Sequence, residues 1–174
     1  MSDMQWIAIM IVSGIGLSIC LYFMHKSKHG VPGLKAIDPD FQWPDMSMSY
    51  TPDKLFTTFD GIGKEGQKKL KRLWLIDFAF IICLLGAMAY ITNKNVLIDV
   101  IRYVMYGAAT ARAVLDAAEN MLLMAVSDAY PKTKRTRMAK ISSIVTLGKW
   151  VMMGIWIAGL FVQLGIRSVQ ISGS

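Results

Sequence analysis

Four long apolar blocks constrain this chain more than any other feature of its sequence. They cover residues 6–24, 73–91, 96–127 and 141–166. A helix needs roughly 20 mostly apolar residues to cross the hydrocarbon core of a bilayer. Only helices and closed barrels satisfy their backbone hydrogen bonds there. The sequence therefore predicts an all-α fold, a four-helix transmembrane bundle in which residues 1–174 form a single membrane domain.

Composition supports a membrane protein and argues against several other classes. Hydrophobic residues make up 54% of the chain and the mean hydropathy is +0.42, which is too apolar for an ordinary soluble domain. Cys20 and Cys83 both lie inside apolar blocks, and no Cys/His group has metal-ligand spacing. We therefore expect no cofactor and no metal site. Residues 1–5 contain Asp3 and no basic residue, so the first block is expected to be a retained helix rather than a signal peptide.

The net charge of +7 is concentrated in the loops, at residues 25–35, 64–72 and 132–140. Such runs can indicate nucleic-acid binding. In a chain with membrane spans the positive-inside rule explains them more simply. The sequence thus predicts that loops 25–72 and 132–140 are cytoplasmic, that both termini lie outside, and that nucleic acid is not a partner. The short turn at 92–95 makes the second and third spans an antiparallel hairpin.

The large loop also contains a predicted helix. Thr51 is a suitable N-cap, and Pro52 and Asp53 suit the first turn. The helix would end near residues 61–63, and its apolar residues predict a short interfacial helix on the membrane surface. Gly61, Gly63 and Gly66 spell G-x-G-x-x-G, but no strand precedes them, so the dinucleotide-binding interpretation is rejected.

Charged residues inside the third block are the candidate site. At about 100° per residue, its polar side chains fall within one arc of a helix; they are Arg112, Asp116, Glu119 and Asn120. Polar and aromatic residues of the fourth block share an arc as well: Ser142, Thr146, Lys149, Trp156 and Gln163.

Helical rise places these groups at similar depths. Glu119 and Asn120 lie eight or nine residues in from Asp128, and Lys149 lies as far from Lys140, so both sites are roughly 12–14 Å deep. A charge at the bilayer centre costs about 2.5–3.5 kcal/mol even on the lenient insertion scale. The charged groups should therefore face inward and pair with one another.

The expected pairs are Arg112 with Asp116, and Lys149 with Glu119 or Asp77. Asp77 lies only five residues from Arg72, so it could instead reach the interface and pair with Lys71 or Arg72. Three acids face two bases, which leaves one carboxylate for proton transfer or for binding a cation or amine. Alternatively, the cluster only fixes the register of the bundle.

Short motifs resemble those of a group of mainly bacterial four-span membrane proteins whose activity is not established. They are Asp116-x-x-Glu119-Asn120 and Thr146-x-x-Lys149-Trp150, with a Gly-rich basic approach to Asp77. The resemblance covers residues 50–166. It implies no activity, but it groups these residues as one unit and implies a bacterial inner (cytoplasmic) membrane.

Three functions remain open. In the first, the protein binds or transports a small lipophilic or amphipathic ligand from the cytoplasmic leaflet. Its site would comprise Asp77, Arg112, Asp116, Glu119, Asn120 and Lys149, with the acids receiving a polar or cationic group. Trp150, Trp156 and the Met152–Met153 pair could supply an apolar wall.

In the second, the protein is a membrane enzyme with acid–base candidates Glu119 and Asp116, and Lys149 as electrostatic stabiliser. In the third, it is a structural or regulatory subunit of a larger membrane complex. Membrane lipids are expected partners in each case. Small residues at Gly14/Ser18 and Gly154/Gly159 suit either internal packing or a homo-oligomer.

Overall fold

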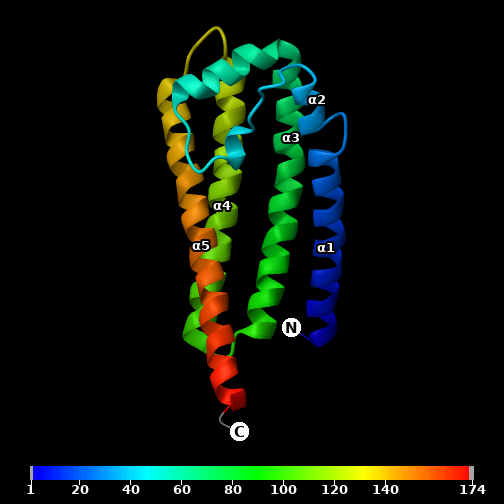
Figure 1. Ribbon diagram of the computed structural model, residues 1–174, viewed down its shortest axis with the longest axis vertical. Coiled ribbons are helices and arrows are strands. Elements are labelled where there is room, and N and C mark those ends of the chain that lie inside the picture. The colour runs from blue at the N-terminus through cyan, green and yellow to red at the C-terminus, as the bar shows by residue number, and fades with distance from the viewer. Residues whose placement is uncertain (1, 173–174) are drawn as a thin grey trace.

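The computed structural model describes residues 2–172, and these form helices and loops without any strand. The helices are α1 (Asp3–His25), α2 (Val31–Lys35), the 3₁₀ turn η1 (Pro44–Met46), α3 (Pro52–Asn95), α4 (Asp99–Ala129) and α5 (Thr136–Ser172). The four long helices lie side by side, with α3 between α1 and the α4–α5 pair (Figure 1). Both termini lie at one end of the molecule, and the long loops lie at the other. The all-α prediction is confirmed.

Neighbouring helices pack in chain order: α1 on α3, α3 on α4, and α4 on α5. Glycines allow the close approach of α1 and α3, because a Cβ at Gly16 would collide with the Cys83 Sγ and one at Gly86 with the Ser13 Oγ. The Ser18 hydroxyl bonds instead to the carbonyl of Gly14 in its own helix. The Gly14/Ser18 stripe is therefore not part of this internal packing.

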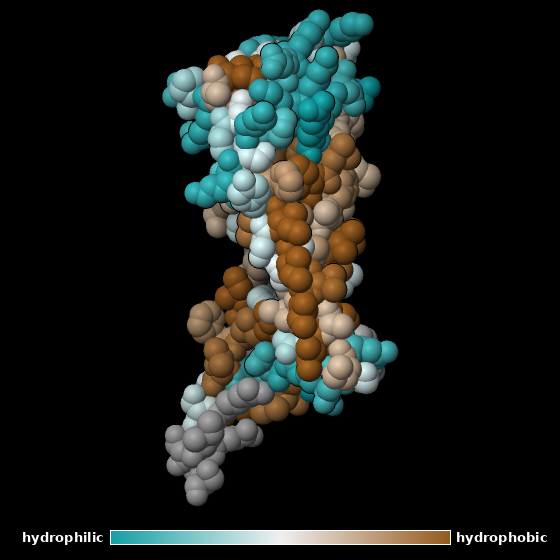
Figure 2. All heavy atoms as spheres, turned by 90° about the vertical axis from the view of Figure 1, so that its right-hand side faces the viewer, coloured by the Kyte–Doolittle hydropathy of each residue, from teal (hydrophilic) through white to brown (hydrophobic). Residues whose placement is uncertain are grey.

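Three helices are long and apolar enough to cross a membrane by length and composition: α1, α3 and residues Thr136–Ile166 of α5. Helix α4 does not belong to this group, so composition supports three of the four predicted spans. The charges in the middle of α4 are nevertheless buried. Between its two ends, the side chains that α4 exposes are all uncharged: Val100, Tyr103, Val104, Thr110, Val114 and Met121. On the face formed by α1, an apolar band separates two hydrophilic ends (Figure 2).

The connection between α3 and α4 falls at residues 96–98 rather than at 92–95, because α3 continues to Asn95. At its other end, α3 begins where the sequence predicts, since the Thr51 hydroxyl caps the helix by accepting from the Lys54 amide. It bends at Gly63, whose φ of +57° is a conformation that favours glycine.

The segment before this bend, residues 52–62, is here called the cap helix. It lies across the loop end of the bundle (Figure 1). Its apolar side chains are buried: Leu55, Phe56, Phe59 and Ile62. Phe56 stacks on Tyr130 with 5.4 Å between ring centroids. The apolar face predicted to lie on the membrane is thus covered by the protein itself.

A second loop segment, residues 36–51, is here called the strap. It runs from α2 past η1 to the start of α3, and Phe41, Trp43 and Tyr50 are buried along it. Its end is fixed to α5, because the Tyr50 amide donates to the Ser143 Oγ at 3.1 Å and the Tyr50 hydroxyl lies 2.7 Å from the Ser142 Oγ. The strap therefore connects the α1 side of the molecule to α5.

One contact between the cap helix and α4 gives a pH-dependent prediction. The Tyr130 hydroxyl donates to the Asp60 carboxylate, and this bond raises the Tyr130 pKa to about 12. The unfolded value is about 10. The bond should therefore stabilise the fold fully below pH 10 and lose its effect as the pH rises through 12.

Thermal unfolding of wild type and Tyr130→Phe in detergent, from pH 8 to pH 11.5, measures this contribution. The wild type should be more stable at pH 8, and the difference should shrink above pH 10. A difference that stays constant over the whole range would contradict the role of the bond, since the titration of other groups cancels in the comparison.

Candidate functional site

Four charged side chains on α4 and α5 form one connected group, here called the ion cluster: Arg112, Asp116, Glu119 and Lys149. The Lys149 Nζ lies 2.9 Å from the Asp116 Oδ1 and 2.7 Å from the Glu119 Oε2. The Arg112 Nη2 lies 2.8 Å from the Asp116 Oδ2. All four residues are at most 8% exposed, and Glu119 is fully buried. Lys149 thus holds two carboxylates of α4 from the neighbouring helix.

Two further polar contacts extend the cluster. The Asn120 Nδ2 donates to the Asp77 Oδ2 of α3 at 2.7 Å, and the Thr146 hydroxyl donates to Glu119. Asp77 is 4% exposed and points into the bundle. The alternative in which Asp77 reaches the interface and pairs with Lys71 or Arg72 is wrong, because Asp77 is buried, Lys71 pairs with Asp128 and Arg72 is exposed.

All six predicted site residues therefore come together, and α3, α4 and α5 each contribute. The predicted Arg112–Asp116 and Lys149–Glu119 pairs are present. Lys149 also bonds Asp116, a partner that the sequence did not predict. Sequence spacing identified the members of the group, but not which side chain of one helix faces which of the next.

The polar arc predicted on α5 is buried along its whole length and finds partners on three other segments. Ser142 meets the strap through Tyr50. Further along, the Trp156 Nε1 donates to the Thr92 Oγ1 at 2.9 Å, and the Gln163 Oε1 accepts from the Leu97 amide at 3.0 Å. These contacts fix the rotation of α5, so that Lys149 faces α4.

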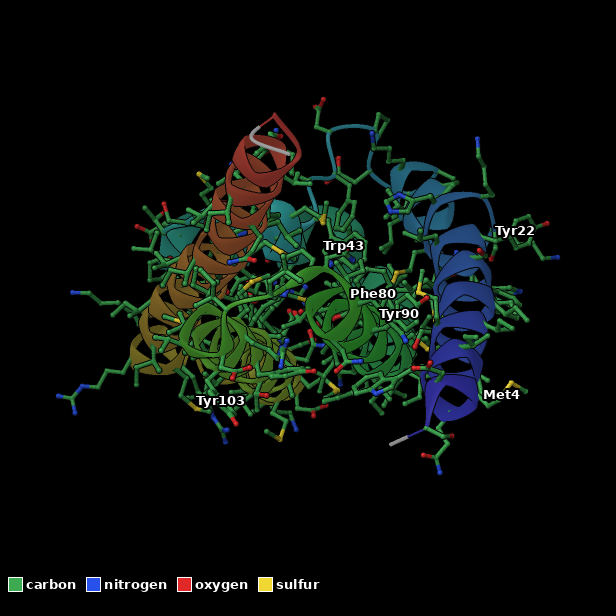
Figure 3. The ribbon with its side chains drawn as sticks, turned by 90° about the horizontal axis from the view of Figure 1, so that it is seen from below. Met4, Tyr22, Trp43, Phe80, Tyr90 and Tyr103 are labelled. Atoms are coloured by element: carbon green, nitrogen blue, oxygen red, sulfur yellow. The ribbon has the colours of Figure 1, made fainter. Side chains whose placement is uncertain are left out.

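Beside the ion cluster lies a cavity of about 210 Å³. Its walls come from α1, α3, α4, α5 and the strap: Leu21, Met24, His25, Trp43, Met46, Asp77, Phe80, Leu84, Arg112, Asp116, Lys149, Trp150 and Met153. Trp43 and Phe80 lie in the space between α5 and α1, whereas Tyr22 and Tyr103 point outward (Figure 3). The polar residues thus form one wall of a mainly apolar cavity.

The apolar wall only partly matches the predicted one. Trp150 and Met153 line the cavity, but Trp156 is bonded to Thr92 elsewhere. His25 is exposed, as expected for the basic flank, yet it also lines the cavity. Sequence reasoning missed Trp43 and Phe80; the apolar character of the strap was the only signal for Trp43.

Three nitrogen donors at the cavity wall have no acceptor among the described residues. The Trp43 Nε1, the Trp150 Nε1 and the Arg112 Nη1 are buried and have no hydrogen-bond partner among the described residues. All three residues line the cavity. A buried N–H without a partner costs free energy, so these groups could be satisfied by a molecule bound between them.

Across residues 2–172, no group of three or more His, Cys, Asp or Glu side chains is arranged to hold a metal ion.

The three long apolar helices and the buried ion cluster are features of a helical membrane protein. No family model matches the chain, and neither the curated proteins nor the solved structures include a match.

The central place of Lys149 gives a stability prediction. In Lys149→Met, Glu119 loses its cation and Asp116 keeps only Arg112, so the variant should lose about 3–5 kcal/mol of unfolding free energy. Adding Glu119→Gln should restore part of the loss, because it removes the charge left without a cation. Chemical unfolding in mixed micelles measures both changes.

Lys94→Met is the matched control. Lys94 pairs with the exposed Asp3 at 2.7 Å near the N-terminal end, where solvent screens the charges. It should change stability little. Equal losses in Lys149→Met and Lys94→Met would show that the ion cluster does not hold α4 and α5 together.

Proposed function

We propose that this protein binds one small amphipathic molecule from the membrane in the cavity beside the ion cluster. The supporting observation is the cavity itself, which has apolar walls and one polar wall formed by Asp77, Arg112, Asp116 and Lys149. This combination of an apolar lining and a few polar groups is typical of small-molecule sites. Transport of the same molecule is the wider form of this proposal.

The position of the cavity suits entry from the lipid. Helices α1 and α5 both contribute to its wall, but they are not among the helix pairs that pack along their lengths. A bilayer would therefore border the cavity between them, below the strap. A volume of about 210 Å³ is small compared with the roughly 300–1,000 Å³ of drug-sized sites. It suits a headgroup and the start of one chain, with the rest of the chain in the lipid.

The proposal includes α4 as a fourth span. Its outward side chains between the two ends are uncharged, and its buried charges are paired inside the bundle. The free-energy cost of placing α4 in a bilayer is therefore lower than its composition suggests.

The proposal also places the loop end in the cytoplasm. Fourteen of the nineteen basic residues belong to that end: Lys26, Lys28, Lys35, Lys54, Lys64, Lys68, Lys69, Lys71, Arg72, Lys132, Lys134, Arg135, Arg137 and Lys140. The positive-inside rule then favours termini outside and a cavity open to the cytoplasmic leaflet.

The two alternative functions receive less support. An acid–base enzyme needs a carboxyl group that reaches its substrate. Glu119 does not line the cavity, and Asp116 is held by two cations. A purely structural subunit is favoured by the pairing within the ion cluster, but it gives no reason for a cavity beside that cluster.

Cysteine labelling tests the topology. Single cysteines at Ser2, Asp99 and Lys134, in a background with Cys20→Ser and Cys83→Ser, are treated with an impermeant maleimide on intact and permeabilised cells. Positions 2 and 99 should react in intact cells, and position 134 only after permeabilisation. Equal reactivity of positions 99 and 134 in intact cells would show that α4 does not cross the membrane.

Filling the cavity tests the binding proposal. Native mass spectrometry would record the binding of dodecyl amphiphiles with carboxylate, phosphate, methyl-ester and amine heads to purified protein. Wild type should bind one molecule of at least one of them. Leu84→Trp places a larger side chain in the cavity wall and should weaken that binding at least tenfold, because the added ring occupies the space of the ligand.

Leu75→Trp is the matched control, since it makes the same change on the same helix at an exposed position, 60% accessible. It should bind like wild type. Equal binding by Leu84→Trp and wild type, or no binding of any of the four probes, would refute the proposed function.

A further inference from the structure

We infer that the cavity recognises a headgroup that presents oxygen acceptors, such as a carboxylate, an ester or a phosphate, and discriminates against an ammonium. This inference rests on the proposed function and deepens it by naming the chemical class of the ligand head. It reverses the polarity expected from the sequence, in which the excess of acids suggested a cation or an amine.

The acids of the site already accept from donors of the protein itself. Asp116 receives Arg112 on one oxygen and Lys149 on the other. Glu119 lies behind Lys149 and accepts from Thr146. Asp77 accepts from Asn120. An ammonium headgroup would have to compete with donors that the protein itself supplies at hydrogen-bond distance.

The polar groups that remain without a partner at the cavity wall are donors. The indole nitrogens of Trp43 and Trp150 and the Arg112 Nη1 lack partners among the described residues. Trp43 and Arg112 are each more than nine-tenths buried. An indole N–H can only donate, and a guanidinium has no acceptor. A ligand that satisfies these three atoms must therefore bring acceptors.

The charges at the cavity wall also fit a ligand with acceptor oxygens. The charged residues that line the cavity, Asp77, Asp116, Arg112 and Lys149, balance one another, and His25 stands at its loop end. The lining charges themselves thus give a cation no net attraction, and Glu119, the one further acid of the group, lies behind Lys149 and outside the lining. Arg112 adds a specific preference, because a guanidinium fork matches the geometry of a carboxylate or phosphate.

The two indoles come from different segments, which suits a ligand that enters between them. Trp43 belongs to the strap and Trp150 to α5. The strap is fixed to α5 through Tyr50, and both tryptophans line the cavity. A headgroup with two or more oxygens could then bridge the indoles and Arg112.

The test compares four probes with the same chain at pH 7.4: dodecanoate, dodecyl phosphate, methyl dodecanoate and dodecylamine. Dissociation constants come from titrations followed by native mass spectrometry. At least one oxygen-bearing probe should bind ten or more times more tightly than dodecylamine. Comparison of the carboxylate, phosphate and ester arms then shows which acceptor is preferred.

Trp43→Phe and Trp150→Phe keep an aromatic side chain but replace the indole by a smaller phenyl ring, which removes the N–H donor. Each should weaken the preferred probe by about tenfold, which is the usual effect of one lost hydrogen bond to a polar or charged group, and should leave dodecylamine unchanged. The dissociation constants of the preferred probe and of dodecylamine are compared within each variant. Partial misfolding lowers the amount of active protein for both probes, so it does not change their ratio.

Trp74→Phe is the matched control. The Trp74 Nε1 is also buried without a partner among the described residues, but Trp74 lies in the core and does not line the cavity. It should change no constant by more than about twofold, because it leaves the lining donors intact.

Tighter or equal binding of dodecylamine would overturn the acceptor inference while leaving the binding function in place. Unchanged constants in both indole variants would also overturn it. Absence of binding by all four probes would instead refute the binding function itself, and the two failures are therefore distinguishable.

Discussion

The bond of Lys149 to Asp116 and Glu119 is the interaction on which this structure depends most. It joins α5 to α4 deep inside the bundle, and one residue after Glu119 on α4, Asn120 bonds Asp77 of α3. A buried charge without a partner is far more costly than a buried pair. Once α4 carries two carboxylates at this depth, α5 must therefore present a cation there. The rotation of α5 follows, and its other polar residues, from Ser142 to Gln163, then meet Tyr50, Thr92 and Leu97.

The same pairing supports our proposal that α4 is a fourth span, although its composition does not identify it as one. A hydropathy window adds the cost of Arg112, Asp116 and Glu119 as if each were alone in lipid. In the folded bundle these side chains are buried and paired, and the lipid would meet Val104, Val114 and Met121 instead. Composition reports the free-energy cost of inserting one helix alone. The cost of inserting a whole bundle depends on the side chains that face the lipid after the helices have packed.

Sequence periodicity could predict the faces and depths of the helices, because both follow from 100° and 1.5 Å per residue. It therefore placed Asp77, Glu119 and Lys149 in one layer. It could not choose between partners on different helices, since that choice depends on the relative rotation of α3, α4 and α5. The position of the strap was harder to predict. Phe41 and Trp43 marked it as more apolar than a free linker, but an irregular segment has no period, so nothing indicated that Trp43 lines the cavity.

The polarity of the cavity shows why counting charges along a sequence is a poor guide to ligand chemistry. Three acids and two bases suggest an acceptor-rich site that needs a cation. In three dimensions the acids are covered by Arg112, Lys149, Thr146 and Asn120, and what faces the cavity beyond these bonds is nitrogen donors. Two of those donors belong to neutral tryptophans, which no charge count includes. The chemical character of such a site is set by the hydrogen-bonding atoms that remain after the protein has satisfied its own groups, and at the cavity wall the atoms that remain are donors on Trp43, Trp150 and Arg112.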